Sequence, residues 1–141
     1  MQTNWNLTHI FQSKEKWFEE KEELKEKIKE HETHLKQLTM DTFKEVLEEK
    51  IQIDEQIEKI YCYPKRFLDI DNQDKEHQNM FNEALRIYEQ IVKLSQFFEK
   101  FILKNIENIQ KFVDENPYYN RYLSLYLRKK GLFRKFKYLV Q

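Results

Sequence analysis

Residues 14–38 read KEKWFEEKEELKEKIKEHETHLKQL, and this stretch decides the fold class. Its apolar side chains recur at intervals of seven, four and three residues, while lysine and glutamate fill most positions between them. This spacing predicts a long helix with one apolar stripe and many opposite charges one turn apart on its other faces. The stripe consists of Trp17, Leu24, Ile28, His31, Leu35 and Leu38. Ser13 stands just before it, where its hydroxyl can cap the helix.

A second helix is expected downstream, with Thr39 as its N-cap and Asp41 in its first turn. Pro64 should kink or end this helix, because proline lacks an amide hydrogen and clashes with the preceding turn. Lys50 is expected at the edge of the buried face. That face comprises Phe43, Val46, Leu47, Lys50, Ile53, Ile57, Ile60 and Tyr61.

A third helix should begin after Asp74, which is placed to cap it at the end of an aspartate-rich turn. A short helix should follow and stop before Asn116-Pro117, and a last helix should run from Pro117 to a C-cap at Gly131. The third helix is predicted to bury Phe81, Leu85, Tyr88, Ile91, Leu94, Phe98 and Phe101. The last two should bury Ile106, Ile109, Phe112 and Val113, then Tyr119, Tyr122, Leu123, Tyr126 and Leu127.

The composition agrees with an all-α protein. The 141 residues include one glycine and two prolines, too few for the tight turns of a sandwich or barrel or for a glycine-rich nucleotide loop. The single Cys62 cannot form an internal disulfide or a cysteine zinc cluster. We therefore expect an elongated antiparallel bundle of about four to five helices, with long first, second and third helices.

The charges balance overall but not along the chain. Residues 1–115 contain all 25 acidic residues and 18 of the 25 basic ones, so the seven basic residues of 116–141 have no acidic neighbour in that segment. These seven alternate with aromatic residues, a composition suited to single-stranded nucleic acid or an anionic membrane surface. We favour the alternative that this basic segment docks on the acidic body of the same chain.

No catalytic, cofactor-binding or metal-binding residue is predicted in this chain. His31 and His34 stand three residues apart, whereas the zincin motif H-E-x-x-H places two histidines four apart on one helix face. We expect His31 to pack in the seam and His34 to be solvated. His9 and His77 stand alone, and Cys62 lacks a neighbourhood that clearly activates a thiol. Glutamate pairs such as Glu48-Glu49 alternate with lysines, which is typical of a solvated helix face.

Several short motifs, in order, resemble the N-terminal helical region of the oligoendopeptidase F family, zinc metallopeptidases related to thimet oligopeptidase. The resemblance covers roughly residues 4–130. Its motifs are Trp5-x-Leu7-Thr8-x-Ile10-Phe11 with Trp17, Tyr61-x-Tyr63, Asp69-x-Asp71, Glu76-x-Gln78 with Ala84, Phe97-Phe98-Glu99, Ile102-Leu103, Asp114-Glu115-Asn116-Pro117, Tyr119-x-Arg121-Tyr122-Leu123 and Leu127-Arg128-Lys129-Lys130.

This resemblance implies a helical lobe over 1–130, followed by a divergent basic and aromatic tail over 131–141. In the family the lobe is non-catalytic, and the H-E-x-x-H helix lies downstream. We therefore expect a product truncated before the catalytic domain, from a frame-shifted gene or as a piece of a longer protein. Zinc and short peptides would bind only to a full-length relative. The expected partners are that catalytic domain or a second copy, bound through an exposed apolar helix face.

The sequence leaves two alternatives open. The first helix could pair with its copy as a short coiled coil. Alternatively, the basic tail could bind nucleic acid or a membrane surface, although we disfavour both of these as partners.

The chain shows no signal peptide and no apolar run near the roughly 20 residues of a spanning helix, so we expect a cytoplasmic protein.

Overall fold

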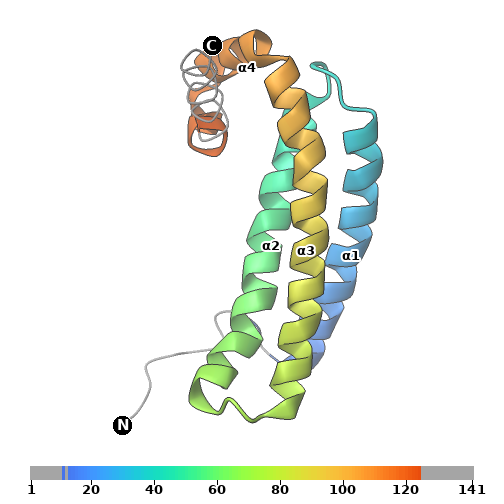
Figure 1. Cartoon of the computed structure of the whole chain (residues 1–141), viewed down its shortest axis with the longest axis vertical. Helices are drawn as coiled ribbons and strands as arrows, with labels where there is room; N and C mark the ends of the chain where they lie inside the picture. Colours follow the sequence, from blue (N-terminus) through green and yellow to red (C-terminus); the bar gives the residue numbers. More distant parts are fainter. Residues whose placement is uncertain (1–10, 12, 125–141) are drawn as a thin grey trace, which may run out of the picture. The chain divides into compact units, whose positions relative to one another are not determined.

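The computed structural model describes residue 11 and residues 13–124, and every regular element in this part of the chain is helical. The elements are α1 (Lys14–Lys36), α2 (Phe43–Ile70), α3 (Lys75–Lys104), α4 (Ile106–Glu115) and the 3₁₀ turn η2 (Pro117–Tyr119). The three long helices are easily followed in Figure 1. The expected all-α fold is confirmed, as are its long first, second and third helices.

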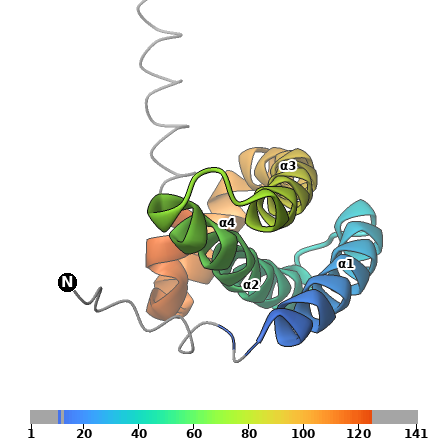
Figure 2. The ribbon, with the colours of Figure 1, turned by 90° about the horizontal axis from the view of Figure 1, so that it is seen from below.

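The chain divides into two compact units, Met1–Leu94 and Ser95–Gln141. The first unit contains α1, α2 and the first part of α3, seen along their axes in Figure 2. Trp17 near the start of α1 reaches the carbonyl of Ile60 near the end of α2, so these two helices are antiparallel. Lys14 pairs with Glu76 at the start of α3, which places the starts of α1 and α3 at the same end. The unit is therefore an up-down-up bundle of three helices.

Helix α1 forms as its sequence predicts. The hydroxyl of Ser13 accepts a hydrogen bond from the amide of Lys16 at 3.2 Å, which confirms the N-cap. The expected stripe is buried from Trp17 to Leu35. Leu38 lies beyond the end of the helix and is half-buried. The stripe has one further buried member, Lys21, which the sequence reading left on the charged face.

Helix α2 begins three residues later than a Thr39 cap would allow. The N-cap is Thr42, whose side chain makes no capping hydrogen bond to the helix. Instead the Thr42 hydroxyl accepts from the amide of Thr39 at 3.1 Å. The predicted Thr39 cap was therefore wrong, because these two threonines bond to each other and close the turn between α1 and α2.

Helix α2 also continues through Pro64 to Ile70, so of the two effects expected of Pro64, a kink or an end of the helix, the end does not occur. A proline at this position leaves the carbonyl of residue 60 without its usual amide donor. The indole Nε1 of Trp17 lies 2.9 Å from the Ile60 oxygen and donates to it. A side chain of α1 thus replaces the hydrogen bond that Pro64 removes, and the buried carbonyl remains satisfied.

The buried faces of α2 and α3 are partly those expected. On α2 the predicted aliphatic residues are buried, but Tyr63 takes the place of the half-buried Tyr61. On α3 the buried face is rotated by about one residue from the expected one. Ile91, Leu94 and Phe98 are buried as predicted, whereas Tyr88 is exposed. The buried positions of α3 are His77, Met80, Ala84, Ile87, Ile91, Leu94, Phe98 and Ile102.

The second unit contains the rest of α3, then α4 and η2. Helix α4 ends at Glu115, before Asn116-Pro117 as expected, and buries Ile109 and Val113. The chain after Pro117 first forms the 3₁₀ turn η2 and becomes α-helical over 120–124. Tyr119 and Leu123 are buried there as predicted. The expected C-cap Gly131 and the tail over 131–141 lie outside the described residues.

Candidate functional site: buried polar side chains of the three-helix unit

Three polar side chains are buried among the described residues, namely Lys21, His31 and His77. All three belong to the first unit. Buried ionisable groups are the first candidates for chemistry, because burial shifts the pKa of such a group and removes competing water. Each of the three lies in a separate cluster of side chains.

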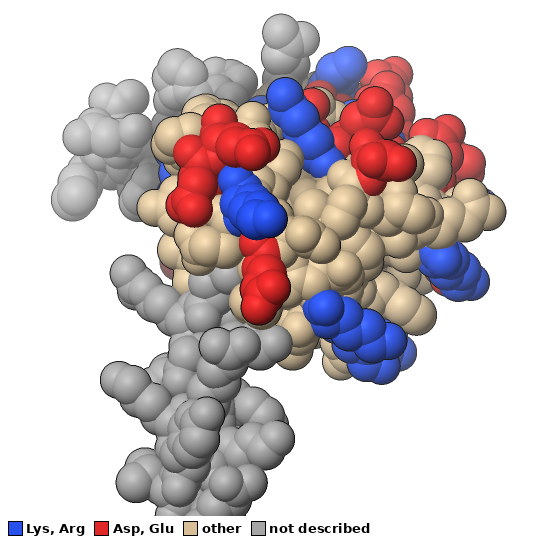
Figure 3. Space-filling model, turned by 90° about the horizontal axis from the view of Figure 1, so that it is seen from above, with Lys and Arg blue, Asp and Glu red and all other residues tan. Residues whose placement is uncertain are grey.

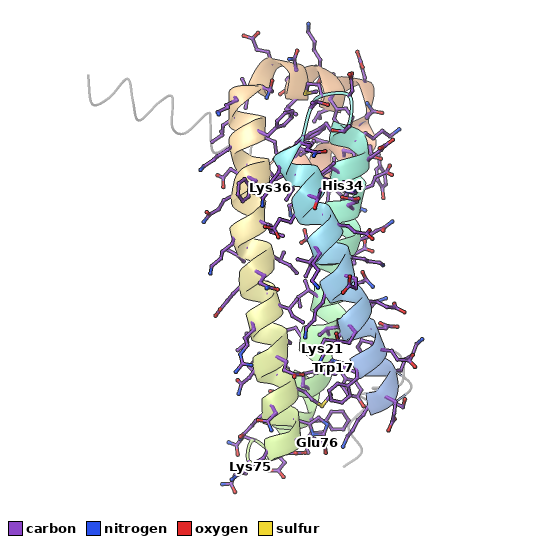
Figure 4. The ribbon with its side chains drawn as sticks, turned by 90° about the vertical axis from the view of Figure 1, so that its right-hand side faces the viewer. Trp17, Lys21, His34, Lys36, Lys75 and Glu76 are labelled. Atoms are coloured by element: carbon purple, nitrogen blue, oxygen red, sulfur yellow. The ribbon has the colours of Figure 1, made fainter. Side chains whose placement is uncertain are left out.

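The Lys21 ammonium lies between two aromatic rings and two carboxylates. Its nitrogen is 4.9 Å from the ring centre of Phe18 and 5.5 Å from that of Trp17. It donates to Oε2 of Glu83 on α3 at 3.0 Å and lies 3.6 Å from Oε1 of Glu22. Figure 4 shows Trp17 and Lys21 one turn apart on α1. The pairing satisfies the buried charge and ties α1 to α3.

Sequence reasoning placed Lys21 on the charged face, although its position carried a signal. Lys21 follows Trp17 by four residues and precedes Leu24 by three, so helical spacing assigns it to the seam. A lysine can occupy such a site because its methylene stem is apolar and only the terminal nitrogen needs polar partners.

A second cluster joins the end of α1 to α2. Nδ1 of His31 lies 3.0 Å from Oε1 of Glu49, and Nδ1 of His34 lies 2.7 Å from Oε2 of the same carboxylate. An ionised carboxylate only accepts, so both imidazoles donate to Glu49. His31 is buried and His34 exposed, as expected from the sequence. Glu49 is half-buried, whereas the sequence predicted that it lies on a solvated helix face.

The burial of His31 predicts a pH dependence of stability. Burial lowers the pKa of His31 below its ordinary value near 6.5, more strongly than the bond to Glu49 raises it. The unfolded chain therefore binds more protons as the pH falls below about 6.5, and the stabilisation from neutral His31 is lost there. We expect the free energy of unfolding to decrease from about pH 7 to 5 and to decrease less in His31→Gln.

Denaturant titrations across this pH range would measure the effect. His34→Gln is the matched control, because His34 bonds to the same carboxylate but is exposed. The control should retain most of the wild-type slope. An unchanged slope in His31→Gln would show that another group titrates.

The third cluster is at the start of α3. The carboxylate of Asp74 accepts from the amides of Glu76 and His77 at 3.1 and 3.3 Å, which confirms Asp74 as the cap. Its Oδ2 also lies 2.6 Å from Nδ1 of His77. This hydrogen bond from His77 is the main reason why the pKa of Asp74 is below its usual range.

His77 is therefore not the isolated histidine that the sequence suggested. Its ring stacks on Phe67 with centroids 4.0 Å apart and only 4% of the residue is exposed. Its Nε2 is buried and has no hydrogen-bond partner among the described residues. The side chain packs as a flat aromatic group between α2 and the cap of α3.

These clusters do not combine into one reactive centre. No group of three or more His, Cys, Asp or Glu residues within 11 and 13–124 is placed to hold a metal ion. Cys62 is half-buried on α2. His9 lies outside the described residues. Each of the three buried side chains instead contacts a residue of another helix.

The surface charges of the described part are of both signs, and Figure 3 shows red and blue side chains intermixed. Three of the ion pairs on α1 join residues three apart, such as Lys25 and Glu22 at 3.4 Å. In the second unit Arg121 lies over the rings of Tyr118 and Tyr122, at 5.5 and 4.8 Å. The other six basic residues of segment 116–141, from Arg128 onward, are outside the described residues. No helix in the described part of the chain is long and apolar enough to cross a membrane.

The chain is distantly similar to a protein described as "Oligoendopeptidase F, chromosomal" from Lactococcus lactis subsp. cremoris. The two are 28% identical over an alignment of 106 residues, which covers 73% of this chain and 18% of the relative. The chain thus spans less than a fifth of the length of the relative. No protein-family model and no solved structure matches the chain. The similarity supports a distant relation to this peptidase, as the sequence motifs indicated.

Proposed function

We propose that this chain is a non-catalytic helical lobe of an oligoendopeptidase F-like zinc metallopeptidase that hydrolyses short peptides. The observation that carries the proposal is the similarity of 73% of this chain to 18% of oligoendopeptidase F. The lobe would supply structure to that enzyme, and the zinc and the catalytic groups would belong to the remainder of the enzyme. Its expected partner is the catalytic domain of such a peptidase.

The three-helix unit supports a structural role for the lobe. Its buried Lys21 and His31 are held by carboxylates of neighbouring helices, at 3.0 Å in both cases. Trp17 supplies a hydrogen bond that α2 needs. These polar groups stabilise contacts between helices, a role suited to a rigid lobe.

The observation that favoured a coiled coil through the first helix no longer supports it. The stripe that suggested it is buried in the first unit from Trp17 to Leu35. A coiled coil needs this stripe on the outside, where a partner helix can insert its side chains. We therefore do not propose self-association through α1.

A complementation assay tests the proposed function. The chain is mixed with Lactococcus oligoendopeptidase F from which the matching segment has been deleted, and hydrolysis of a fluorogenic short peptide is followed with zinc present. We expect no chelator-sensitive turnover by the chain alone. We expect the mixture to bind in a pull-down and its kcat/KM to exceed that of the deleted enzyme by at least about tenfold, equivalent to about 1.4 kcal/mol of transition-state stabilisation.

Lys21→Glu is the negative control and should not complement, because it places a carboxylate beside those of Glu22 and Glu83 and should unfold the chain. An exposed substitution on α1, Glu23→Gln, should complement as well as the wild type. Turnover by the chain alone that a chelator abolishes would refute a non-catalytic lobe. Failure of the folded chain to bind the deleted enzyme would refute a packing role.

A further inference from the structure

The two compact units of the chain carry opposite net charges. Met1–Leu94 contains 15 basic and 21 acidic residues, whereas Ser95–Gln141 contains ten basic and four acidic ones. The four acidic residues of the second unit all precede residue 116, and seven of its ten basic residues follow residue 115. We call residues 116–141 the basic segment. It contains seven aromatic residues besides its seven positive charges.

The described start of the basic segment presents an arginine between two tyrosine rings. The guanidinium carbon of Arg121 lies 5.5 Å from the ring centre of Tyr118 and 4.8 Å from that of Tyr122. Its Nη2 also donates to the Tyr122 hydroxyl at 2.7 Å. Tyr118 is 64% exposed, and Arg121 is exposed beside it. Flat aromatic rings and a guanidinium on one surface are the groups on which nucleic-acid bases stack.

The packing of the second unit leaves this cluster on the surface. Tyr119 and Leu123 are buried, and the ring of Tyr119 stacks on Phe112 of α4 with centroids 5.5 Å apart. The exposed side chains within 117–124 are those of Pro117, Tyr118, Asn120 and Arg121. This surface therefore offers a ring and a cation, whereas binding to a membrane surface needs a face of apolar side chains that can enter the lipid.

The acidic residues of the chain itself are the competing partner for the basic segment. Three glutamates of α1 already pair with lysines three residues away, at 3.4 or 3.5 Å, as Glu22 does with Lys25. Figure 3 likewise shows acidic and basic side chains intermixed. These internal pairs weaken the attraction that the sequence predicted between the basic segment and the acidic body of the chain, and they favour an external polyanion.

We propose that the basic segment binds single-stranded nucleic acid, with Tyr118 and Arg121 as its described contact site. A base stacks on the exposed ring of Tyr118, and the Arg121 guanidinium binds a neighbouring phosphate. The six basic residues from Arg128 onward neutralise further phosphates along the strand. Every base has a flat face, so this mode of binding needs no particular nucleotide sequence. The inference does not depend on the proposed function, because it concerns only the second unit.

Fluorescence anisotropy of a labelled oligothymidylate of about 20 nucleotides, titrated with the full chain, tests the proposal. We expect binding at about 50 mM salt that weakens by about twentyfold or more at about 200 mM, as when three or more phosphates of a single strand are neutralised. A duplex of the same length should bind less tightly, because its bases already stack on one another and cannot stack on Tyr118.

Substitutions at Tyr118 separate stacking from charge. Tyr118→Ala should weaken binding by about tenfold without changing its salt dependence, because a ring is lost and no charge is. Tyr118→Phe keeps the ring and should bind within about twofold of the wild type. Tyr88→Ala is the matched control, since Tyr88 is 51% exposed but belongs to the first unit, and it should bind like the wild type.

Arg121→Gln tests the phosphate contact. It should lower the slope of the logarithm of the affinity against the logarithm of the salt concentration by about 0.7, the value for one phosphate of a single strand. Far-UV circular dichroism of each variant shows that it is folded, as expected for substitutions of exposed side chains.

Absence of binding at the lower salt concentration would overturn the proposal and favour docking of the basic segment within the chain. Equal affinity for an abasic strand of the same length would also overturn it, because charge alone would then explain the binding. The same holds if Tyr118→Ala binds like the wild type or if Tyr88→Ala weakens binding equally. Binding to vesicles that contain phosphatidylserine but not to the oligonucleotide would instead identify a membrane surface as the partner and refute nucleic-acid binding.

Discussion

Replacing Trp17 with phenylalanine should destabilise the protein by about 2–4 kcal/mol. Phenylalanine is smaller than the buried indole, and it cannot donate to the Ile60 carbonyl that Trp17 Nε1 reaches at 2.9 Å. Pro64 offers that carbonyl no amide hydrogen, so the oxygen is left buried without a partner. Urea titration followed by far-UV circular dichroism measures the loss.

A double-mutant cycle with Pro64→Ala isolates the hydrogen bond from the loss of volume. Alanine at position 64 restores an amide hydrogen that can bond to the Ile60 carbonyl along the helix. Trp17→Phe should then cost about 1–2 kcal/mol less in the Pro64→Ala background than in the wild type. Equal costs in both backgrounds would show that only packing of the indole matters. Phe18→Leu is the neighbouring control and should change stability by no more than about 0.5–1 kcal/mol, because Phe18 is 41% exposed.

Reversing the buried charge at position 21 should have the second large effect. Lys21→Glu places a carboxylate beside Glu83 and Glu22, whose oxygens lie 3.0 and 3.6 Å from the present ammonium. It also replaces a cation by an anion against the negative faces of two aromatic rings. We expect a loss of about 4 kcal/mol or more, enough to unfold a marginally stable domain.

Lys21→Met separates the charge of Lys21 from its packing. Methionine keeps the length of the side chain and removes the ammonium, and Glu83 is exposed enough to be hydrated. Replacing a buried ion pair by an apolar side chain of similar volume is often neutral, so we expect a change within about 1 kcal/mol. Thermal unfolding of the two variants would show whether the charge of Lys21 or its packing stabilises the protein. If Lys21→Met is as destabilising as Lys21→Glu, the ion pair itself holds α1 to α3.

The sequence predicts the position of α1 better than that of any other helix, and there are physical reasons. Its stripe is narrow and the other faces are almost wholly charged, so only one rotation of the helix buries apolar surface. Ser13 also caps it through an interaction three residues long, which needs no tertiary partner. The same holds for the Asp74 cap of α3.

The rotation of α3 could not be predicted in this way. Apolar residues cover a wide arc of this helix, and two stripes one residue apart both have helical spacing. The stripe that contains Ala84 is buried, and a small side chain lets neighbouring helices approach closely. The choice therefore depended on how α1 and α2 pack, and it left Tyr88 on the surface.

The buried polar side chains likewise depended partly on local sequence and partly on partners far away in the chain. The sequence indicated that His31 belongs in a seam, and its burial agrees. The partner Glu49 stands 18 residues away on another helix, so no local pattern could identify it. Likewise the burial of Lys21 depended on Glu83, which is 62 residues away.

The sequence by itself determined that this protein is helical, where its long helices run, and that it resembles one part of a peptidase. The helical character and the positions of the long helices follow from local spacing, caps and composition, which act over one or two turns. Only the tertiary structure decided which face of α3 is buried, how α2 passes through Pro64, and which carboxylates hold the buried cation and histidines. Those outcomes depend on groups that are far apart in the chain and meet only when the helices pack, because a buried donor, acceptor or charge must find its partner there.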